Sequence, residues 1–248
     1  MLKGKVAVVT GASKGIGFEI AREFAERGAS VILCSRKKSA AQKAADRIHG
    51  VTLAEQLDIT DADSVRKLVA RINERYGRID ILANNAGYPF ERKVWYKSFH
   101  DVTDDELDRI IEVDLKGTAR ISRAVIPLMT KQGGVIVSIS STPSISGYTE
   151  GAPYTLAKAA IIAMTKHIAL EYGARNVRAY TLALGNIASE ATFGSMTPAE
   201  RKKAAEENAM KRWGDPREVA KIAASIAGDD FAFATGNTIV IDGGTVLL

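Results

Sequence analysis

The stretch VAVVTGASKGIGFEI, residues 6–20, places an apolar run directly before a glycine-rich turn and a segment with helical periodicity. The run VAVVT predicts a buried strand, and Ile16, Ile20 and Phe24 then recur at the spacing of one helix face. A strand, a glycine turn and a helix N-terminus, in this order, form the context that a dinucleotide-binding motif needs. The stretch therefore predicts a strand and a helix joined by a phosphate-binding turn.

The glycines of this turn have separate expected roles. Gly11 permits a tight turn, Gly15 lets the backbone approach a pyrophosphate, and Gly17 lets the helix pack closely on the strand. Free N–H groups at the start of the helix would bind the phosphates. The alternative is a turn of small residues without a ligand. The residues expected to contact a cofactor here are Gly11, Ser13, Lys14, Gly15, Ile16 and Gly17.

Strand-like and helix-like stretches alternate along the whole chain. This alternation predicts an α/β fold: one doubly wound Rossmann-type domain over residues 1–248, with a parallel sheet of about seven strands and helices on both faces. Ligands then gather at the carboxyl ends of the strands. Strands are expected at 5–11, 29–36, 51–58, 79–87, 133–141, 176–185 and 237–244, and helices at 16–28, 39–49, 61–77, 103–129 and 154–173.

Composition excludes several classes of protein. The 34 basic and 29 acidic residues leave a net charge of +5, but they are interspersed, so no basic block indicates nucleic acid. Cys34 is the single cysteine, which favours a reducing compartment. The longest uncharged stretch, 132–149, is rich in Ser, Gly, Thr and Pro and is no membrane span. No signal peptide or metal site is expected, and a cytoplasmic protein is the default.

The end of the second predicted strand indicates which nicotinamide cofactor is preferred. Proteins that bind NAD usually place an acid there, on the ribose hydroxyl. Here the residues are Ser35, Arg36 and Lys37, and Lys14 of the glycine turn should face the same pocket. A serine and cations suit a 2′-phosphate, so NADP(H) is predicted over NAD(H). A solvated basic loop is the alternative.

Two further strand ends carry candidate cofactor contacts. Asp58, followed by Ile59, could accept a hydrogen bond from the adenine amine. Asn85, Ala86 and Gly87 are small enough for backbone contact with a ribose. Taken singly, each also has the composition of an ordinary turn.

Tyr154 and Lys158 lie four positions apart, so a helix would place them one turn apart on one face. A free tyrosine ionises near pH ~10, too high for a base at neutral pH. An adjacent ammonium favours the phenolate and would let the phenol exchange protons near neutrality. An incidental surface pair is the alternative.

Four motifs in this order resemble those of the short-chain dehydrogenase/reductase family along essentially the whole chain. The layout is most similar to 3-oxoacyl-acyl-carrier-protein reductases and related carbonyl reductases, which implies NADPH-dependent reduction of a carbonyl to an alcohol. The residues that carry the resemblance are Thr10-Gly11 followed after three residues by Gly15-Ile16-Gly17, Asn84-Asn85-Ala86-Gly87, Ser141 ahead of Tyr154 and Lys158, and the terminal IDGG.

The resemblance implies a role for each catalytic residue. Tyr154 would be the general acid/base, and Lys158 would favour its phenolate and reach the nicotinamide ribose. Ser141, thirteen residues before Tyr154, would polarise the substrate, with Ser140 as the fallback. Ile187 would make a backbone contact near the nicotinamide.

The chain departs from the family pattern at three positions. Asp114 stands where relatives have an asparagine whose helix bend frees a carbonyl for a proton relay. We expect Asp114 to keep this relay and to stabilise protonated Lys158. Leu184 replaces the usual proline after the sixth strand, and Tyr180 replaces an asparagine four residues before it.

Two segments are expected to determine the choice of substrate. The loop 88–102 carries Trp95, Tyr96 and Phe99 among cations, and could meet an apolar or anionic substrate or form an oligomer contact. Residues 186–213 correspond to a mobile lid in relatives. Homotetramers or homodimers are usual in the family.

Some partners and functions stay open. In the acyl-carrier reductases, basic residues beside the cleft meet the acidic carrier protein; Arg175 falls at one such position, but Gln132, next to Lys131, stands at the other. The alternatives to a carbonyl reductase are a secondary-alcohol, sugar or polyol dehydrogenase of the same fold, and a non-catalytic sensor or scaffold that binds NADP(H).

Overall fold

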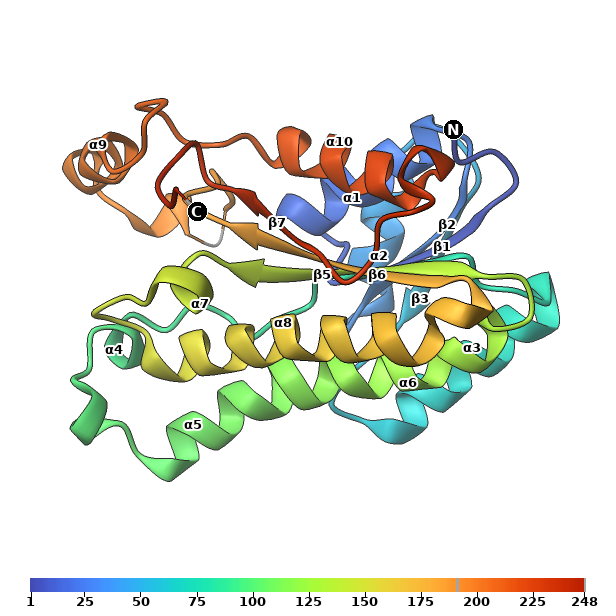
Figure 1. The fold of residues 1–248 in the computed structure, drawn as a ribbon, viewed down its shortest axis with the longest axis horizontal. Helices are drawn as coiled ribbons and strands as arrows, with labels where there is room; N and C mark the ends of the chain where they lie inside the picture. Colours follow the sequence, from blue (N-terminus) through green and yellow to red (C-terminus); the bar gives the residue numbers. More distant parts are fainter. Residues whose placement is uncertain (191, 248) are drawn as a thin grey trace.

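The computed structural model describes residues 1–190 and 192–247, so Ala191 of the expected lid and the last residue, Leu248, lie outside it. Over the described residues, seven parallel strands form one sheet in the order β3-β2-β1-β4-β5-β6-β7 (Figure 1). This confirms the expected doubly wound α/β fold. The strands are β1 Val6–Thr10, β2 Ser30–Ser35, β3 Thr52–Gln56, β4 Ile81–Asn84, β5 Gly134–Ser141, β6 Val177–Leu184 and β7 Thr238–Ile241.

Helices cover both faces of the sheet (Figure 1). One face packs on α1 Gly15–Glu26, α2 Lys38–Ala45 and α10 Pro216–Ala227, and the other on α3 Ala62–Tyr76, α6 Thr118–Met129 and α8 Ala152–Tyr172. The shorter helices are α4 Arg92–Trp95, α5 Asp104–Ile111, α7 Pro143–Ser146 and α9 Pro198–Glu206. No helix among the described residues is long and apolar enough to cross a membrane.

Burial on both faces explains why the strands are continuous apolar runs. In β1, Val8 contributes to the core beneath α3, α6 and α8, whereas Ala7 and Val9 contribute to the core beneath α1, α2 and α10. A strand covered on both sides has no polar face, so an alternating pattern is not expected.

The expected helix over 103–129 is continuous but irregular. A capping box of Thr103 and Glu106 starts α5, and a π-helical turn over Glu112–Gly117 separates it from α6. Such turns widen a helix locally and are frequent at functional sites. This turn carries Asp114, which is fully buried.

The sheet reverses its strand order between β1 and β4, which pair side by side. The glycine turn follows β1, and the segment Asn84–Gly87 follows β4, so both lie at this switch point. Crevices at such points are where open α/β sheets bind ligands.

Candidate active site

The glycine turn has the backbone geometry that the sequence predicts. Gly11 and Gly15 have φ values of 65° and 58°, in the left-handed region that favours glycine. A Cβ at Gly17 would lie 2.5 Å from the carbonyl oxygen of Gly11, so no larger residue fits there. A Cβ at Gly15 would meet nothing closer than Ser189 at 3.9 Å. The turn thus stays open beside the N-terminus of α1, as a bound pyrophosphate requires.

Asn85 and Thr10 hold this turn in place. The Asn85 amide Nδ2 donates to the carbonyl oxygens of Thr10 and Gly11, each at 3.1 Å. The Thr10 hydroxyl accepts from the backbone N–H groups of Asn85 and Ala86, both at 3.0 Å. The Asn85 side chain is therefore occupied in bracing the turn, and only the backbone of this segment remains for a ribose.

The residues expected near the adenosine ribose lie at the carboxyl ends of β1 and β2. The Ser35 hydroxyl donates to the Lys37 carbonyl oxygen and accepts from its N–H, which shapes the loop. Arg36 is exposed, and Lys14 forms an exposed ion pair with Glu190 at 3.8 Å. Glu190 was not anticipated from the sequence, because it reaches the turn only through the fold.

Asp58 lies at the end of β3 with Ile59 buried beside it. The Asp58 carboxylate accepts hydrogen bonds from the Thr60 hydroxyl and backbone N–H. These bonds, helped by the nearby charges of Arg36 and Arg120, hold the pKa of Asp58 below its ordinary value, although burial opposes the shift. The carboxylate is therefore ionised at neutral pH and can accept a hydrogen bond from an adenine amine.

Tyr154 and Lys158 lie together near the N-terminus of α8. The Lys158 Nζ lies 5.5 Å from the centroid of the Tyr154 ring, donates to the Ile139 carbonyl oxygen at 3.3 Å, and lies 3.3 Å from Asp114 Oδ2. Lys158 is 5% exposed and Asp114 is fully buried. The ammonium is therefore paired with a buried carboxylate and lies near the Tyr154 ring.

The surroundings of Lys158 shift its pKa in opposite directions. Burial lowers its pKa, whereas the charge of Asp114, with a further contribution from the Tyr154 phenol, raises it, and the net pKa lies above the ordinary value. Lys158 is therefore protonated throughout the physiological range. The second Asp114 oxygen accepts from the backbone N–H of Tyr88, which ties the carboxylate to the loop after β4.

The serines of β5 point in different directions. Ser141 lines the cavity in front of Tyr154, and its hydroxyl donates to the Leu184 carbonyl oxygen at 3.1 Å. The Ser140 hydroxyl instead donates to the Lys158 carbonyl oxygen at 2.8 Å and is buried, so the fallback serine faces the core. Ser138 hydrogen-bonds with Asn84 inside the core.

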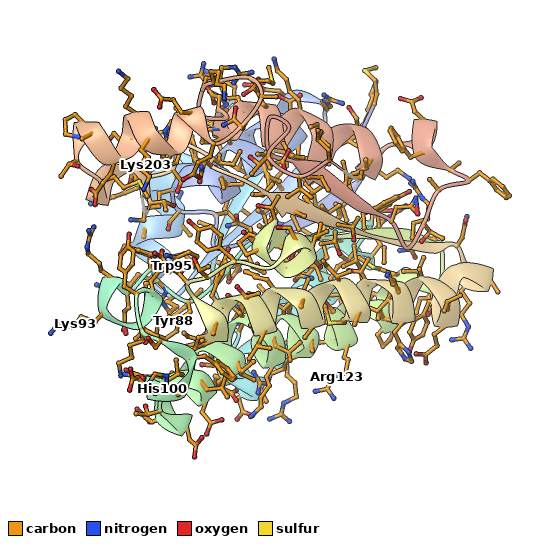
Figure 2. All side chains as sticks on the ribbon, turned by 60° about the vertical axis from the view of Figure 1, so that its left-hand side comes forward. Tyr88, Lys93, Trp95, His100, Arg123 and Lys203 are labelled. Atoms are coloured by element: carbon orange, nitrogen blue, oxygen red, sulfur yellow. The ribbon has the colours of Figure 1, made fainter. Side chains whose placement is uncertain are left out.

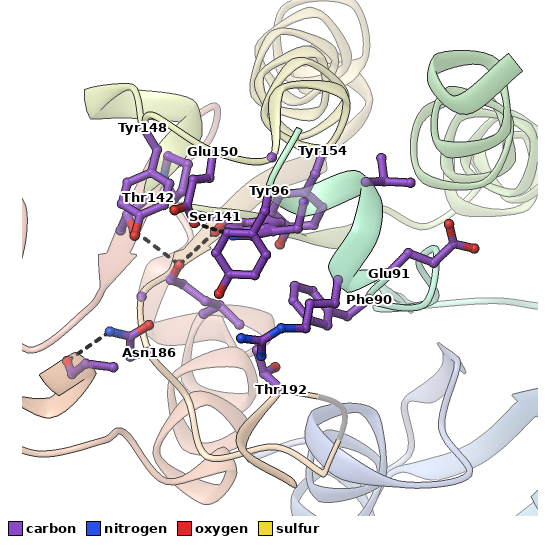
Figure 3. A pocket seen from close by; sticks show the side chains of 18 of the residues that line it. Phe90, Glu91, Tyr96, Ser141, Thr142, Tyr148, Glu150, Tyr154, Asn186 and Thr192 are labelled. Carbon is purple, nitrogen blue, oxygen red and sulfur yellow. Dashed lines mark hydrogen bonds between the residues drawn. The ribbon is translucent and has the colours of Figure 1, made fainter. Parts of the chain in front are cut away.

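A cavity of about 660 Å³ opens in front of Ser141 and Tyr154. Its walls come from the loop after β4, the segment between β5 and α8, and α9. Figure 3 shows Phe90, Tyr96, Tyr148 and Tyr154 around this space. Tyr148 and Glu150 were not singled out from the sequence, although their place between Ser141 and Tyr154 signals that they border the same cavity.

The cations of the loop after β4 do not face the cavity as free charges. Arg92 pairs with Glu200 of α9 at 2.8 Å, and Lys97 pairs with Glu106 at 2.7 Å. Lys93 points outward, away from Trp95, in Figure 2. The expectation that these cations would meet an anionic substrate therefore lacks support in the geometry.

The structure shows what surrounds two of the residues that depart from the family pattern, Leu184 and Tyr180. Leu184 lines the cavity, and its carbonyl oxygen accepts from Ser141 and Thr142. Tyr180 is 1% exposed within the core, and its hydroxyl donates to the carbonyl oxygens of Phe231 and Ala234. Tyr180 thus anchors the segment before β7. Ile187 is buried and pairs with Gly214.

A Rossmann-type sheet, a glycine turn at its switch point and a tyrosine–lysine pair beside a cavity define a class of nicotinamide-dependent oxidoreductases. A family profile described as "Enoyl-(Acyl carrier protein) reductase" matches residues 11–246. The chain belongs to the short-chain dehydrogenase/reductase family and is an enzyme of that type.

Individual relatives are similar over nearly the whole chain. The 3-oxoacyl-[acyl-carrier-protein] reductase FabG of Thermotoga maritima is 34% identical, with 99% of each chain covered. Dehydrogenase/reductase SDR family member 4 of Bos taurus is 36% identical, covering 99% of this chain and 88% of the relative. A crystal structure of a short-chain type dehydrogenase/reductase from Mycobacterium marinum superposes with a TM-score of 0.89 at 30% identity, covering 99% of this chain and 96% of the other.

Proposed function

We propose that this enzyme is an NADPH-dependent reductase that converts a ketone to a secondary alcohol. The observation that supports this most directly is that Tyr154 and Ser141 line one cavity while Lys158 lies against the Tyr154 ring. When bound, NADPH supplies the hydride for the carbonyl carbon. The open glycine turn at Gly15 and the N-terminus of α1 would hold its pyrophosphate.

Three side chains would assist the hydride transfer, each in a different role. Tyr154 gives its phenolic proton to the carbonyl oxygen as negative charge develops there. The Ser141 hydroxyl, which has one hydrogen to donate, turns from Leu184 to that same oxygen and stabilises it. The Lys158 ammonium, kept charged by Asp114, stabilises the phenolate left on Tyr154.

A panel of carbonyl compounds, assayed with NADPH and with NADH by nicotinamide absorbance, tests this proposal. It should include acetoacetyl thioesters, because a 3-oxoacyl-[acyl-carrier-protein] reductase is among the relatives. We expect NADPH oxidation with at least one ketone. Saturable NADPH binding without turnover across the panel would contradict the proposal and favour a sensor.

The preference for NADPH should depend on Arg36. Arg36→Asp is expected to lower the ratio of kcat/KM with NADPH to kcat/KM with NADH by about 100-fold, because a charge-assisted hydrogen bond contributes roughly 1.5–3 kcal/mol and the new carboxylate repels the 2′-phosphate. The matched control is Lys43→Asp, the same charge reversal in the last turn of α2. An unchanged ratio in Arg36→Asp would show that another group selects the cofactor.

The remaining expectations stay predictions. They are a single domain over 1–248, a lid over 186–213, a homotetramer or homodimer, and a cytoplasmic location. The geometry of a single chain does not support an acyl-carrier-protein partner. Gln132 and Arg175 stand at the positions of the basic residues that meet the carrier in the acyl-carrier reductases, and they precede β5 and β6. They lie at the amino ends of these parallel strands, opposite the cavity.

A further inference from the structure

Four aromatic rings form one wall of the cavity: Phe90, Trp95, Tyr148 and Tyr154, here called the aromatic wall. The centroid of the Trp95 ring lies 5.6 Å from that of Tyr154, 5.6 Å from that of Phe90 and 6.3 Å from that of Tyr148. These separations lie in the range at which aromatic rings attract one another. Trp95 is therefore central to the wall and adjacent to the proposed proton donor.

Trp95 is held in a defined orientation. Its Nε1 donates to Glu150 Oε2 at 2.9 Å, and its carbonyl oxygen accepts from the Gly151 N–H at 2.8 Å. A Cβ at Gly151 would lie 2.6 Å from two carbons of the indole ring, so the absence of a side chain there makes room for it. Gly151 also has a φ of 68°, which disfavours other residues. An ordered ring offers binding surface at little entropic cost.

The charges around the cavity disfavour an anionic substrate. Its lining includes the carboxylates of Glu91, Glu150, Glu200 and Glu207 but only two cations, Arg92 and Lys203. Arg92 and Glu200 neutralise each other, which leaves three carboxylates, Glu91, Glu150 and Glu207, against Lys203. Glu150 and Glu207 line the same cavity as Tyr148, and burial together with the charges of Glu207 and Glu150 raises the pKa of Tyr148.

From these observations we infer that the substrate is a ketone whose carbonyl carbon is attached to a flat ring and which carries no negative charge, with Trp95 selecting the ring. This inference rests on the proposed reductase function. The ring stacks on Trp95, which brings the carbonyl to the neighbouring Tyr154. The carbonyl carbon takes a hydride from NADPH, which becomes NADP⁺, and the oxygen takes the Tyr154 proton, so the product is the ring-bearing secondary alcohol.

The first test compares three substrates: an uncharged aryl methyl ketone, the same ketone with a ring carboxylate, and acetoacetyl thioester. We expect the wild-type enzyme to prefer the uncharged aryl ketone over each of the others by about tenfold or more in kcat/KM. Trp95→Leu should raise KM for the aryl ketone about tenfold and change KM for the thioester less than about threefold. Trp95→Phe, which keeps a ring, should retain most of the preference.

Glu150→Gln tests the charge of the wall. The amide keeps an oxygen that can accept from the Trp95 indole N–H but removes the negative charge. We expect the ratio of kcat/KM for the carboxylate-bearing ketone to kcat/KM for the uncharged ketone to rise several-fold in the variant. A preference for the thioester in the wild type, or an equal loss with all substrates in Trp95→Leu, would overturn the inference.

Binding can be measured without turnover, because the chain has two tryptophans. Trp213→Phe leaves Trp95 as the only tryptophan, and the aryl alcohol product should quench its fluorescence. Trp95→Phe leaves Trp213, whose ring centroid lies 5.0 Å from that of Phe193 and which is not in the cavity lining. The fluorescence of this variant should not be quenched. Equal quenching in both variants would contradict the assignment. Quenching of Trp95 without reduction of any ketone would refute the reductase function while supporting the ring site.

Discussion

Replacing Tyr154 with phenylalanine is expected to lower ketone reduction with NADPH by about 10³-fold, because general acid catalysis by a positioned side chain contributes 10²–10⁴-fold. The ring stays, so the contacts with Trp95 and the nearby Lys158 ammonium are kept. The loss should therefore fall on kcat, with the folded structure intact. Steady-state rates from nicotinamide absorbance, together with NADPH binding measured by its fluorescence, check this result.

Tyr172→Phe is the matched control, because Tyr172 is the last residue of the same helix, α8. Its hydroxyl contacts Glu171, far from the cavity, so its removal should leave kcat within about twofold of the wild type. If Tyr154→Phe retained wild-type turnover, a different group would have to deliver the proton, and the proposed roles of Lys158 and Ser141 would fail with it.

The parts of the fold that sequence predicts well depend on local signals. The turn at Gly11–Gly17 combines required backbone conformations with a strand before it and a helix after it, and each strand buried on both faces appears as an apolar run. The position of Lys158 relative to Tyr154 follows from helical spacing alone. None of these inferences needs the tertiary structure.

Contacts between distant segments are the part that sequence could not provide. Arg92 and Glu200 are 108 positions apart, so the pairing that neutralises the cation depends on how the loop after β4 meets α9. The contact between Trp95 and Gly151 likewise forms only once this loop folds over the start of α8. For this reason the composition of the loop left an apolar substrate, an anionic substrate and an oligomer contact open, whereas the fold pairs Arg92 and Lys97 with carboxylates.

Asp114 and Lys158 form a buried pair whose disruption should be costly. Asp114→Ala leaves a buried ammonium without its carboxylate and is expected to lower the free energy of unfolding by about 3–5 kcal/mol at neutral pH. Because the folded pKa of Lys158 is raised, the stabilisation is fully present below the unfolded lysine value, about 10.4, and is lost as pH rises through the folded pKa. Urea unfolding of both proteins should therefore show a deficit that shrinks above about pH 10.

Asp114→Asn separates the charge of this residue from its shape. The amide oxygen can still accept from the Lys158 ammonium, so the loss of stability should be well below that of Asp114→Ala. Without the carboxylate, the lowering effect of burial on the pKa of Lys158 is no longer opposed by Asp114, so the ammonium that stabilises the phenolate is lost at lower pH. The high-pH limb of the pH profile of alcohol oxidation should therefore move to lower pH.

The control for this shift is Asp80→Asn, since Asp80 is also buried and accepts from Arg78 and the Val6 N–H at the other end of the sheet. It should reduce stability without moving the pH profile, because its charge lies too far from Tyr154. An unchanged pH profile of alcohol oxidation in Asp114→Asn would contradict this prediction. It would show that the negative charge of Asp114 does not control proton transfer.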